Sequence, residues 1–250
     1  MKLSQLLSLI SRLADEKGIS TPFICGGLPR DKVLGLTSNL TDIDLTTGDQ
    51  GVHYLAKEIA IKLRLGNKYL TMPDGHATLM VGGLKLDFSS NFIVPNIDSI
   101  LAKQNITNPT SMQEELYSRD FTCNSLLMSM DLKNIFDPLN RGLKDIENRV
   151  IKTCLDPAVT LGYDNKRVVR VLYLAAKLNF DVAPEVMKWI KDNPSSLSNV
   201  KPKYLINKLN KAVEHNTEKV VQLVEAMQLW PYVPPVKALE PYMLRNTKRM

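Results

Sequence analysis

Hydrophobic residues near the N-terminus recur at helical spacing and then give way to short apolar runs. Leucines and isoleucines three or four positions apart predict an amphipathic helix over residues 3–17, which Gly18 would end. Two further helices are expected over about 28–34 and 52–65. Short apolar runs predict strands that start at Phe23 and Asp42 and that cover about 68–72, 77–81 and 84–88. This alternation predicts helices packed on a small, largely antiparallel or mixed sheet.

The middle of the chain is less periodic. Residues 92–112 carry two prolines and little periodicity, which predicts an adaptable loop. After it, Asp137-Pro138 ends an expected strand, Gly142 begins a helix, and residues 149–152 form a last strand. We assign no catalytic residue to this stretch.

Beyond Cys154 the strand-like runs stop and the pattern becomes helical. We therefore predict a boundary near residue 155, with domains over 1–154 and 155–250. The expected fold class is α+β, a small mixed sheet with helices followed by an all-α part. Besides the helix that follows residue 163, helices are expected over about 184–190, 203–213 and 218–229.

Two carboxylates are the first candidates for chemistry. Asp42 and Asp44 alternate with Ile43 and Leu45, so both acids would leave one face of a strand while the apolar pair packs behind them. Neighbouring carboxylates repel unless a cation lies between them, and Mg²⁺ is bound by one or two carboxylates together with substrate phosphates. A lone Asp-x-Asp pair is more often a solvated strand end, so this pair needs support from elsewhere in the chain.

The support comes from the glycine turn before it. Gly26 and Gly27 would let backbone N–H groups approach a phosphate where a helix begins, and Arg30 and Asp31 follow on the first turn. A lone Gly-Gly pair is usually only a turn. A phosphate cradle followed by a pair of metal-binding acids is the equipment of a nucleotidyl-transferring site.

Composition adds a mild preference. The 250 residues carry a net charge of +6, which leans towards a polyanionic partner. Cys25, Cys123 and Cys154 are expected to be reduced and buried, since their number is odd and their surroundings are apolar or mixed. The first residues lack the uninterrupted apolar core of a signal peptide, and no run is long enough to span a membrane. We expect a soluble, cytoplasmic protein.

The motif GG-x-x-RD-x-x-x-G followed by DID resembles a known signature. It is similar to that of the CCA-adding tRNA nucleotidyltransferase and bacterial poly(A) polymerase family, the class II branch of the polymerase-β-like nucleotidyltransferases. The resemblance implies a polymerase-β-like head followed by an all-α neck and body. It also implies that Asp42 and Asp44 bind Mg²⁺, and that Gly26, Gly27 and Arg30 contact the nucleotide.

The resemblance implies a third acid on a later strand. Asp87, in LKLDFSSN, is the candidate that would complete the catalytic carboxylates, although an acid near a strand end is usually just solvated. The Gly82-Gly83 pair before it is a hairpin signal. The family usually has an Arg a few residues later, where this chain reads Ser-Ser-Asn-Phe over 89–92.

A second stretch, SRDFTCNSL, resembles the family motif RRDFTxNAL, with Ser118 in place of the first Arg. The resemblance implies that Arg119 contacts the nucleotide phosphates, that Asp120 helps to recognise the ribose, and that Asn124 belongs to the nucleotide site. A carboxylate suits a ribose hydroxyl because it accepts hydrogen bonds. The alternative is that Asp120 only caps the start of a helix.

The helix expected after residue 163 carries Asp164, Arg167 and Arg170 at intervals of three. Its apolar face comprises Val168, Val171, Leu172 and Ala175. Read alone, the charged residues are an ordinary helix start with intrahelical ion pairs.

LGYDNKRVVRVLYLAAKLNF nevertheless resembles the family's neck motif, EDPLRILRAARFAARLGF. The resemblance implies that Asp164 and Arg167 read the base edge of the incoming nucleotide, with Arg170 nearby, so that C and A are accepted. Tyr163 replaces the usual Glu and Tyr173 replaces a later Arg, which leaves the choice of nucleotide open.

The C-terminal part adds an ambiguous basic group, made of Lys201, Lys203, Lys208 and Lys211. It either faces RNA phosphates or is a solvated helix face. Compared with the family, the chain resembles a short version without the C-terminal tail, so how it would hold tRNA, alone or as a homodimer, stays open.

The combined expectation is a template-independent enzyme that adds CMP and AMP from CTP and ATP to RNA 3′ ends with Mg²⁺. The expected product is the CCA end of tRNA. The alternatives are a poly(A) polymerase that adds only A, and a catalytically weak RNA-binding relative.

Overall fold

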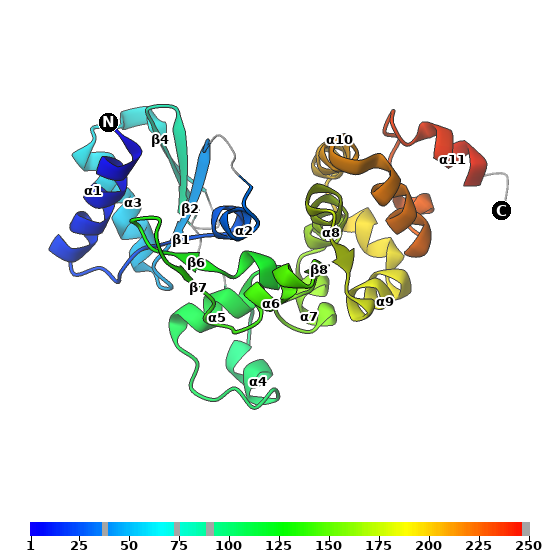
Figure 1. Ribbon diagram of the computed structural model, residues 1–250, viewed down its shortest axis with the longest axis horizontal. Helices are drawn as coiled ribbons and strands as arrows, with labels where there is room; N and C mark the ends of the chain where they lie inside the picture. Colours follow the sequence, from blue (N-terminus) through cyan, green and yellow to red (C-terminus); the bar gives the residue numbers. More distant parts are fainter. Residues whose placement is uncertain (37–39, 73–75, 89–92, 247–250) are drawn as a thin grey trace. The chain divides into compact units, whose positions relative to one another are not determined.

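The computed structural model describes residues 1–36, 40–72, 76–88 and 93–246 (Figure 1). The chain forms two compact units. The first comprises Met1–Arg119 and Cys123–Ile146, and the second comprises Asp120–Thr122 and Glu147–Met250. No helix among the described residues is long and apolar enough to cross a membrane.

The first unit contains a mixed sheet whose described strands follow the order β3-β4-β5-β2-β1-β6-β7. The strands are β1 Phe23–Cys25, β2 Asp42–Thr46, β3 Tyr69–Thr71, β4 Ala77–Val81, β5 Leu84–Phe88, β6 Leu127–Met128 and β7 Ile135–Phe136. β2 and β5 pair in parallel, and the other neighbours are antiparallel. The predicted α+β class with a mixed sheet is confirmed. β6 was not predicted from the sequence, because a strand of two residues is too short to show alternation of apolar and polar side chains.

The helices of this unit are α1 Leu3–Glu16, α2 Gly27–Val33, α3 Gly51–Lys62, α4 Ile97–Ala102, α5 Ser111–Ser118 and α6 Gly142–Glu147. The prediction that 92–112 is a loop is wrong for α4 and for the start of α5, while residues 93–96 and 103–110 lie outside helices and strands. Ile97 and Leu101 of α4 are buried one turn apart, and Thr110 accepts a hydrogen bond from the Gln113 backbone N–H to cap α5. A single buried turn is too short to show a helical period.

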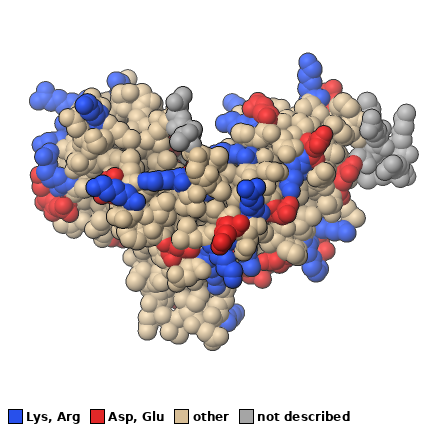
Figure 2. Space-filling view, viewed as in Figure 1, with Lys and Arg blue, Asp and Glu red and all other residues tan. Residues whose placement is uncertain are grey.

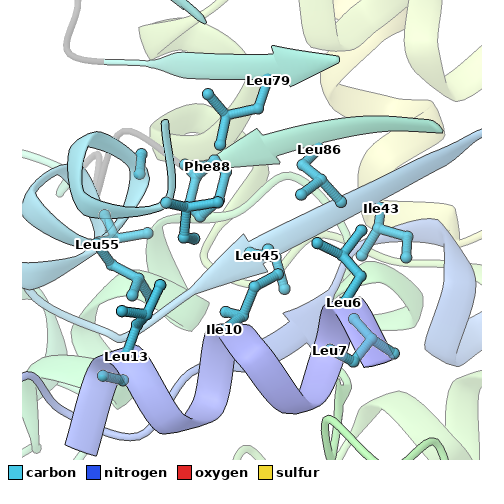
Figure 3. Packing of buried hydrophobic residues seen from close by; sticks show 14 of the residues in the cluster. Leu6, Leu7, Ile10, Leu13, Ile43, Leu45, Leu55, Leu79, Leu86 and Phe88 are labelled. Atoms are coloured by element: carbon cyan, nitrogen blue, oxygen red, sulfur yellow. The ribbon is translucent and has the colours of Figure 1, made fainter. Parts of the chain in front are cut away.

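The core of this unit decides where the polar side chains go. Ile43 and Leu45 of β2 and Leu86 and Phe88 of β5 are fully buried and pack towards α1 and α3 (Figure 3). Because side chains alternate along a strand, the residues between them must leave by the opposite face. Burial of four large apolar side chains, each contributing about 1.5–3 kcal/mol, therefore fixes the direction of the acidic residues on both strands.

The second unit is mainly helical. Its helices are α7 Pro157–Tyr163, α8 Lys166–Leu178, α9 Pro184–Asp192, α10 Pro202–Ala226 and α11 Glu240–Asn246. The description of this part as all-α needs a correction, since β8 Val150–Ile151 pairs in parallel with β9 Asp181–Val182. The backbone N–H of Asp181 donates to the Arg149 carbonyl at 2.8 Å, a bond between segments that no local pattern reveals.

The two longest helices of this unit match the sequence pattern. The predicted apolar face of α8 is confirmed, because Val168, Val171, Leu172 and Ala175 are fully buried. α10 runs through both segments predicted as separate helices. Asn216 has non-helical backbone angles, φ −160° and ψ 94°, and marks the break between them. Shorter 3-10 turns cover Gly66–Lys68, Thr122–Asn124, Pro194–Asn199 and Trp230–Tyr232.

Candidate functional site

The parallel pairing of β2 with β5 brings the predicted acids together. Asp44 lies opposite Asp87 in the register, and Asp42 lies opposite Lys85. Neighbouring strands are about 4.8 Å apart, so side chains from paired positions on one face are direct neighbours. Asp42 is exposed, while Asp44 and Asp87 are half-buried. One face of the sheet thus gathers three carboxylates from two strands.

Asp87 is held by two neighbours that sequence reasoning missed. The Thr78 hydroxyl donates to one Asp87 oxygen at 2.6 Å, and the Lys85 ammonium forms an ion pair with the other. Burial lowers the pKa of Lys85, but the hydrogen bond and the charge of Asp87, with those of Asp42 and Asp44, outweigh it and raise that pKa. The missed signal was strand alternation, which places Lys85 on the same face as Asp87.

A cleft opens beside these acids. It has a volume of about 300 Å³ and is lined by Asp44, Met72, His76, Thr78, Lys85 and Asp87. The lining combines carboxylates with a cation and polar side chains, and the cleft can hold part of a charged small molecule. Residues 89–92, where the family usually has an Arg, lie outside the described residues.

Asp44 is the acid whose ionisation is most affected by its surroundings. Burial raises its pKa, and the charges of Asp87 and Asp42 raise it further, while the Arg119 guanidinium opposes them. An ionised Asp44 therefore needs a cation more than a solvated carboxylate would.

Arg119 lies at the end of α5 and is largely buried. It donates to the Glu115 carboxylate at 2.6 Å and to the Cys25 sulfur at 3.1 Å. Burial lowers the pKa of Arg119, but its two partners outweigh this and raise it, so the charge is retained. Burial also raises the pKa of Cys25 to about 11, which keeps that thiol neutral. Arg119 thus brings a fixed positive charge close to Asp44.

Gly26 is required by the close approach of the turn to Asp44. Its φ is +74°, and a Cβ built there would lie 2.5 Å from an oxygen of Asp44. Only glycine meets both conditions without strain. Gly27 begins α2, and a Cβ there would lie 3.3 Å from the Arg30 guanidinium. The glycine pair therefore lets the start of α2 lie against the acids.

Arg30 has a different environment from the one the motif suggested. Its side chain is 3% exposed, donates to one Asp31 oxygen at 2.8 and 2.5 Å, and donates to the Asn124 side-chain oxygen at 2.5 Å. Arg30 and Asn124 thus bind each other in this structure. Their predicted contact with a nucleotide stays a prediction, and the geometry supports a positioning role that joins α2 to the segment after α5.

The donor chemistry of this edge fits Mg²⁺ in part. Asp42 and Asp44 offer the hard carboxylate oxygens that Mg²⁺ prefers, and the ion needs few protein ligands because it retains water or phosphate. In the described part of the chain, no three Asp, Glu, His or Cys side chains are grouped so as to hold a metal ion. Lys85 neutralises Asp87 instead. The fit therefore rests on the Asp42–Asp44 pair.

Asp120 and Arg170, both in the second unit, form a pair that the sequence did not reveal. The Arg170 Nε donates to Asp120 at 2.6 Å, and a second contact completes a salt bridge. The charge of Asp120 is the main cause that raises the pKa of Arg170. Asp120 caps no α-helix, because α5 ends at Ser118 and only a 3-10 turn at Thr122–Asn124 follows. One Asp120 oxygen accepts from the Phe121 backbone N–H at 2.9 Å.

Asp164 and Arg167 lie at the start of α8. Asp164 lies between α7 and α8, which corrects the prediction that the helix with Arg167 and Arg170 also carries it. Its carboxylate accepts from the backbone N–H of Lys166 at 3.0 Å. Arg167 is buried and donates to the Thr160 carbonyl at 3.4 Å. The roles predicted for both residues in reading a base stay predictions.

Comparisons with known proteins identify the class. Residues 22–152 match the model of the poly A polymerase head domain, and the chain belongs to this family. This range holds the glycine turn, the three acids and the Arg119 segment. The resemblance expected from the motifs is confirmed.

Several similar proteins are named as tRNA nucleotidyltransferases. The chain is 30% identical to tRNA nucleotidyltransferase cca2 of Schizosaccharomyces pombe over 68% of its own length and 38% of that protein. It is also 30% identical to the CC-adding tRNA nucleotidyltransferase of Geobacter sulfurreducens, over 78% of this chain and 40% of that protein. The A-adding enzyme of Aquifex aeolicus is 30% identical over 78% and 23% of the two chains. The aligned part thus spans less than half of each of these relatives.

Solved structures agree with these relatives. A tRNA-processing enzyme with CTP superposes with a TM-score of 0.70 at 26% identity, over 90% of this chain and 57% of that one. A tRNA nucleotidyltransferase complexed with a primer tRNA and an incoming ATP analogue gives 0.68 at 26% identity, over 90% and 62%. The chain thus has the fold of these two enzymes.

The close approach of Gly26 to Asp44 can be tested with alanine. Gly35→Ala, at φ +67° with open space around it, should cost about 1–2 kcal/mol from backbone strain alone. Gly26→Ala should cost about 1–3 kcal/mol more, because its Cβ would also displace the Asp44 carboxylate. Urea unfolding of both variants measures the difference. Equal losses would show that the contact with Asp44 imposes no constraint.

The environment of Asp44 predicts a pH effect of defined sign. The pKa of Asp44 in the folded state lies above its unfolded value of about 3.9. The stability that protonated Asp44 contributes is therefore lost as the pH rises from the unfolded pKa through the folded pKa. Asp44→Asn should therefore be more stable than the parent chain at pH 7.5 in EDTA, and this advantage should shrink at pH 4.5. Urea unfolding at both pH values measures it.

Asp49 provides the matched control. Burial favours a higher pKa for Asp49, but hydrogen bonds from Ser20, Thr47 and the Gly51 backbone outweigh it and lower that pKa. Asp49→Asn should therefore destabilise the protein at pH 7.5, and its effect should fade as pH falls. Destabilisation by Asp44→Asn at pH 7.5 would contradict the conclusion that burial and its acidic neighbours disfavour the charge on Asp44.

Proposed function

We propose that this chain transfers CMP and AMP from CTP and ATP to the 3′ ends of RNA with release of pyrophosphate, and that it builds the CCA end on tRNA that lacks it. The observation that carries the proposal is the register that sets Asp44 beside Asp87 within a poly A polymerase head domain. The names of its relatives support the choice of tRNA, because they include CC-adding, A-adding and CCA-adding enzymes.

Asp42 and Asp44 would hold the Mg²⁺ ions of this reaction. When bound, Mg²⁺ neutralises the triphosphate and lowers the pKa of the attacking 3′-hydroxyl. Asp87 would lie on the side of the site where the attacking 3′-hydroxyl binds. Its carboxylate is oriented by Thr78 and Lys85. The carboxylates thus orient the reacting groups, and fixed charges supply most of the rate.

The triphosphate would lie where the glycine turn meets Arg119. Gly26 lets the backbone at the start of α2 come close to Asp44, and Arg119 keeps its positive charge near that acid. Arg30 and Asn124 would support this arrangement by holding α2 in place. Positive charge that is fixed before substrate binds requires little rearrangement in the transition state.

Asp164 and Arg167 would select the base, and Asp120 with Arg170 would contribute to recognition of the ribose. This part of the proposal follows from the resemblance of α8 to the neck motif. A carboxylate accepts from an exocyclic amine and a guanidinium donates to ring nitrogen or carbonyl, which favours C and A. A cytoplasmic location follows from the proposed tRNA substrate. A homodimer stays an expectation.

A 3′-extension assay tests the proposal. A tRNA transcript that ends before CCA would be incubated with the protein, Mg²⁺ and CTP, ATP, both, or UTP and GTP, and the product ends would be sequenced. We expect C-C-A and then arrest, with UTP and GTP used about 10- to 100-fold less well.

Each other product has a definite meaning. An open tract of A would show a poly(A) polymerase, and addition of only C-C or only A would show a partial activity like that in two relatives' names. Absence of extension on tRNA and on unstructured RNA would contradict the proposal and favour the catalytically weak RNA-binding relative. Mg²⁺-dependent binding of ATP would then support that alternative.

A further inference from the structure

α8 packs beside α10 (Figure 1). Side chains from the two helices form a cluster of cations and aromatic rings. The ammonium of Lys208 on α10 lies 4.6 Å from the centre of the Tyr173 ring on α8 and 5.9 Å from that of Tyr204. Both rings and Lys208 are half-buried. A cation over an aromatic face gains about 0.5–1 kcal/mol, so the rings favour this position of the ammonium.

The cluster extends to the Asp120–Arg170 pair of the same unit. Arg170 forms a salt bridge with Asp120 and a side-chain hydrogen bond with Tyr204. This hydrogen bond holds the Tyr204 side chain in place. Lys208, which the sequence placed in a basic group with Lys201, Lys203 and Lys211, therefore differs from a solvated lysine. Lys201, Lys203 and Lys211 are exposed, whereas Lys208 lies against the rings.

The charges that act most strongly on Lys208 are mainly positive. Burial lowers its pKa first, and the neighbouring cations Arg170, Lys211 and Lys177 lower it further, while Asp120 opposes them. Asp120 is already paired with Arg170. Like charges that are partly withdrawn from water repel, and an anion brought between them relieves that repulsion.

Tyr173 of the cluster stands at a position where the similar family motif has a cation. Tyr173 replaces an Arg of the motif that α8 resembles, and the Lys208 ammonium lies over the Tyr173 ring. A positive charge is thus present beside this position of α8, but it belongs to Lys208 of α10. On the face in Figure 2, Lys and Arg side chains are mixed with Asp and Glu over both units, so the net charge alone marks no such site.

We propose that Lys208 and Lys211 form a phosphate-binding subsite in the second unit. Lys208 is placed there by its position over the Tyr173 ring. Lys211 follows Lys208 by three residues on α10, so both side chains reach the same face. The inference rests on the proposed function. The phosphate comes either from the RNA backbone or from the nucleotide triphosphate, and the two sources are separated by experiment.

The test uses the full chain and Lys208→Met, which keeps an unbranched apolar side chain over Tyr173 but removes the charge. Binding of a fluorescein-labelled tRNA minihelix that lacks CCA would be followed by fluorescence anisotropy in EDTA, over a range of salt concentrations. Binding of ATP would be followed by calorimetry with Mg²⁺. Lys208→Arg keeps the charge and should restore binding. Lys191→Met, an exposed lysine on α9, makes the same change of net charge elsewhere.

If the phosphate belongs to RNA, Lys208→Met should weaken minihelix binding about tenfold. The slope of log binding constant against log salt concentration should then decrease in magnitude by about 0.7–1, while ATP binding is unchanged. If it belongs to the nucleotide, ATP binding should weaken instead. Lys191→Met should change neither.

Equal RNA and ATP binding by Lys208→Met and the parent chain would overturn the subsite, and so would equal losses in Lys208→Met and Lys191→Met. These results would leave the proposed function intact if the parent chain still extends tRNA. A parent chain that neither binds nor extends RNA would contradict both proposals. Circular dichroism and thermal unfolding confirm that each variant is folded.

Discussion

The parallel pairing of β2 with β5 is the constraint on which the candidate site depends. Apolar residues on both strands must face α1 and α3, so Asp44 and Asp87 are forced side by side on the other face. Like charges at this spacing repel, and burial makes the repulsion stronger. The core therefore maintains an acidic edge that would not be stable without cations.

The surroundings of this edge supply those cations at fixed positions. Lys85 pairs with Asp87, and Arg119, held by Glu115, acts on Asp44. The two acids thus differ: Asp87 has a resident partner, whereas burial disfavours the charge on Asp44. An added divalent cation would be attracted most strongly to the side of Asp44 and Asp42. The same reasoning applies to the second unit, where Asp120 balances Arg170 but leaves Lys208 among other cations.

Local patterns were sufficient for the strands that carry the acids, because Ile43 and Leu45 alternate visibly with Asp42 and Asp44. The observed bounds of β4 and β5 match the predicted ranges. The pairings that decide side-chain environment were out of reach. Arg30 with Asn124, and Asp120 with Arg170, join positions 94 and 50 residues apart. Such contacts depend on how elements pack, which no periodicity reports.

The central claim is that Asp42 and Asp44 carry nucleotidyl transfer. The most direct measurement is single-turnover incorporation of AMP into a tRNA that ends in C-C, by the parent chain and by the double variant Asp42→Ala, Asp44→Ala. Asp131→Ala, at an exposed carboxylate on a turn, serves as control. We expect the double variant to lose at least about 10³-fold in rate while still folding and binding RNA. An unchanged rate in the double variant would contradict the account.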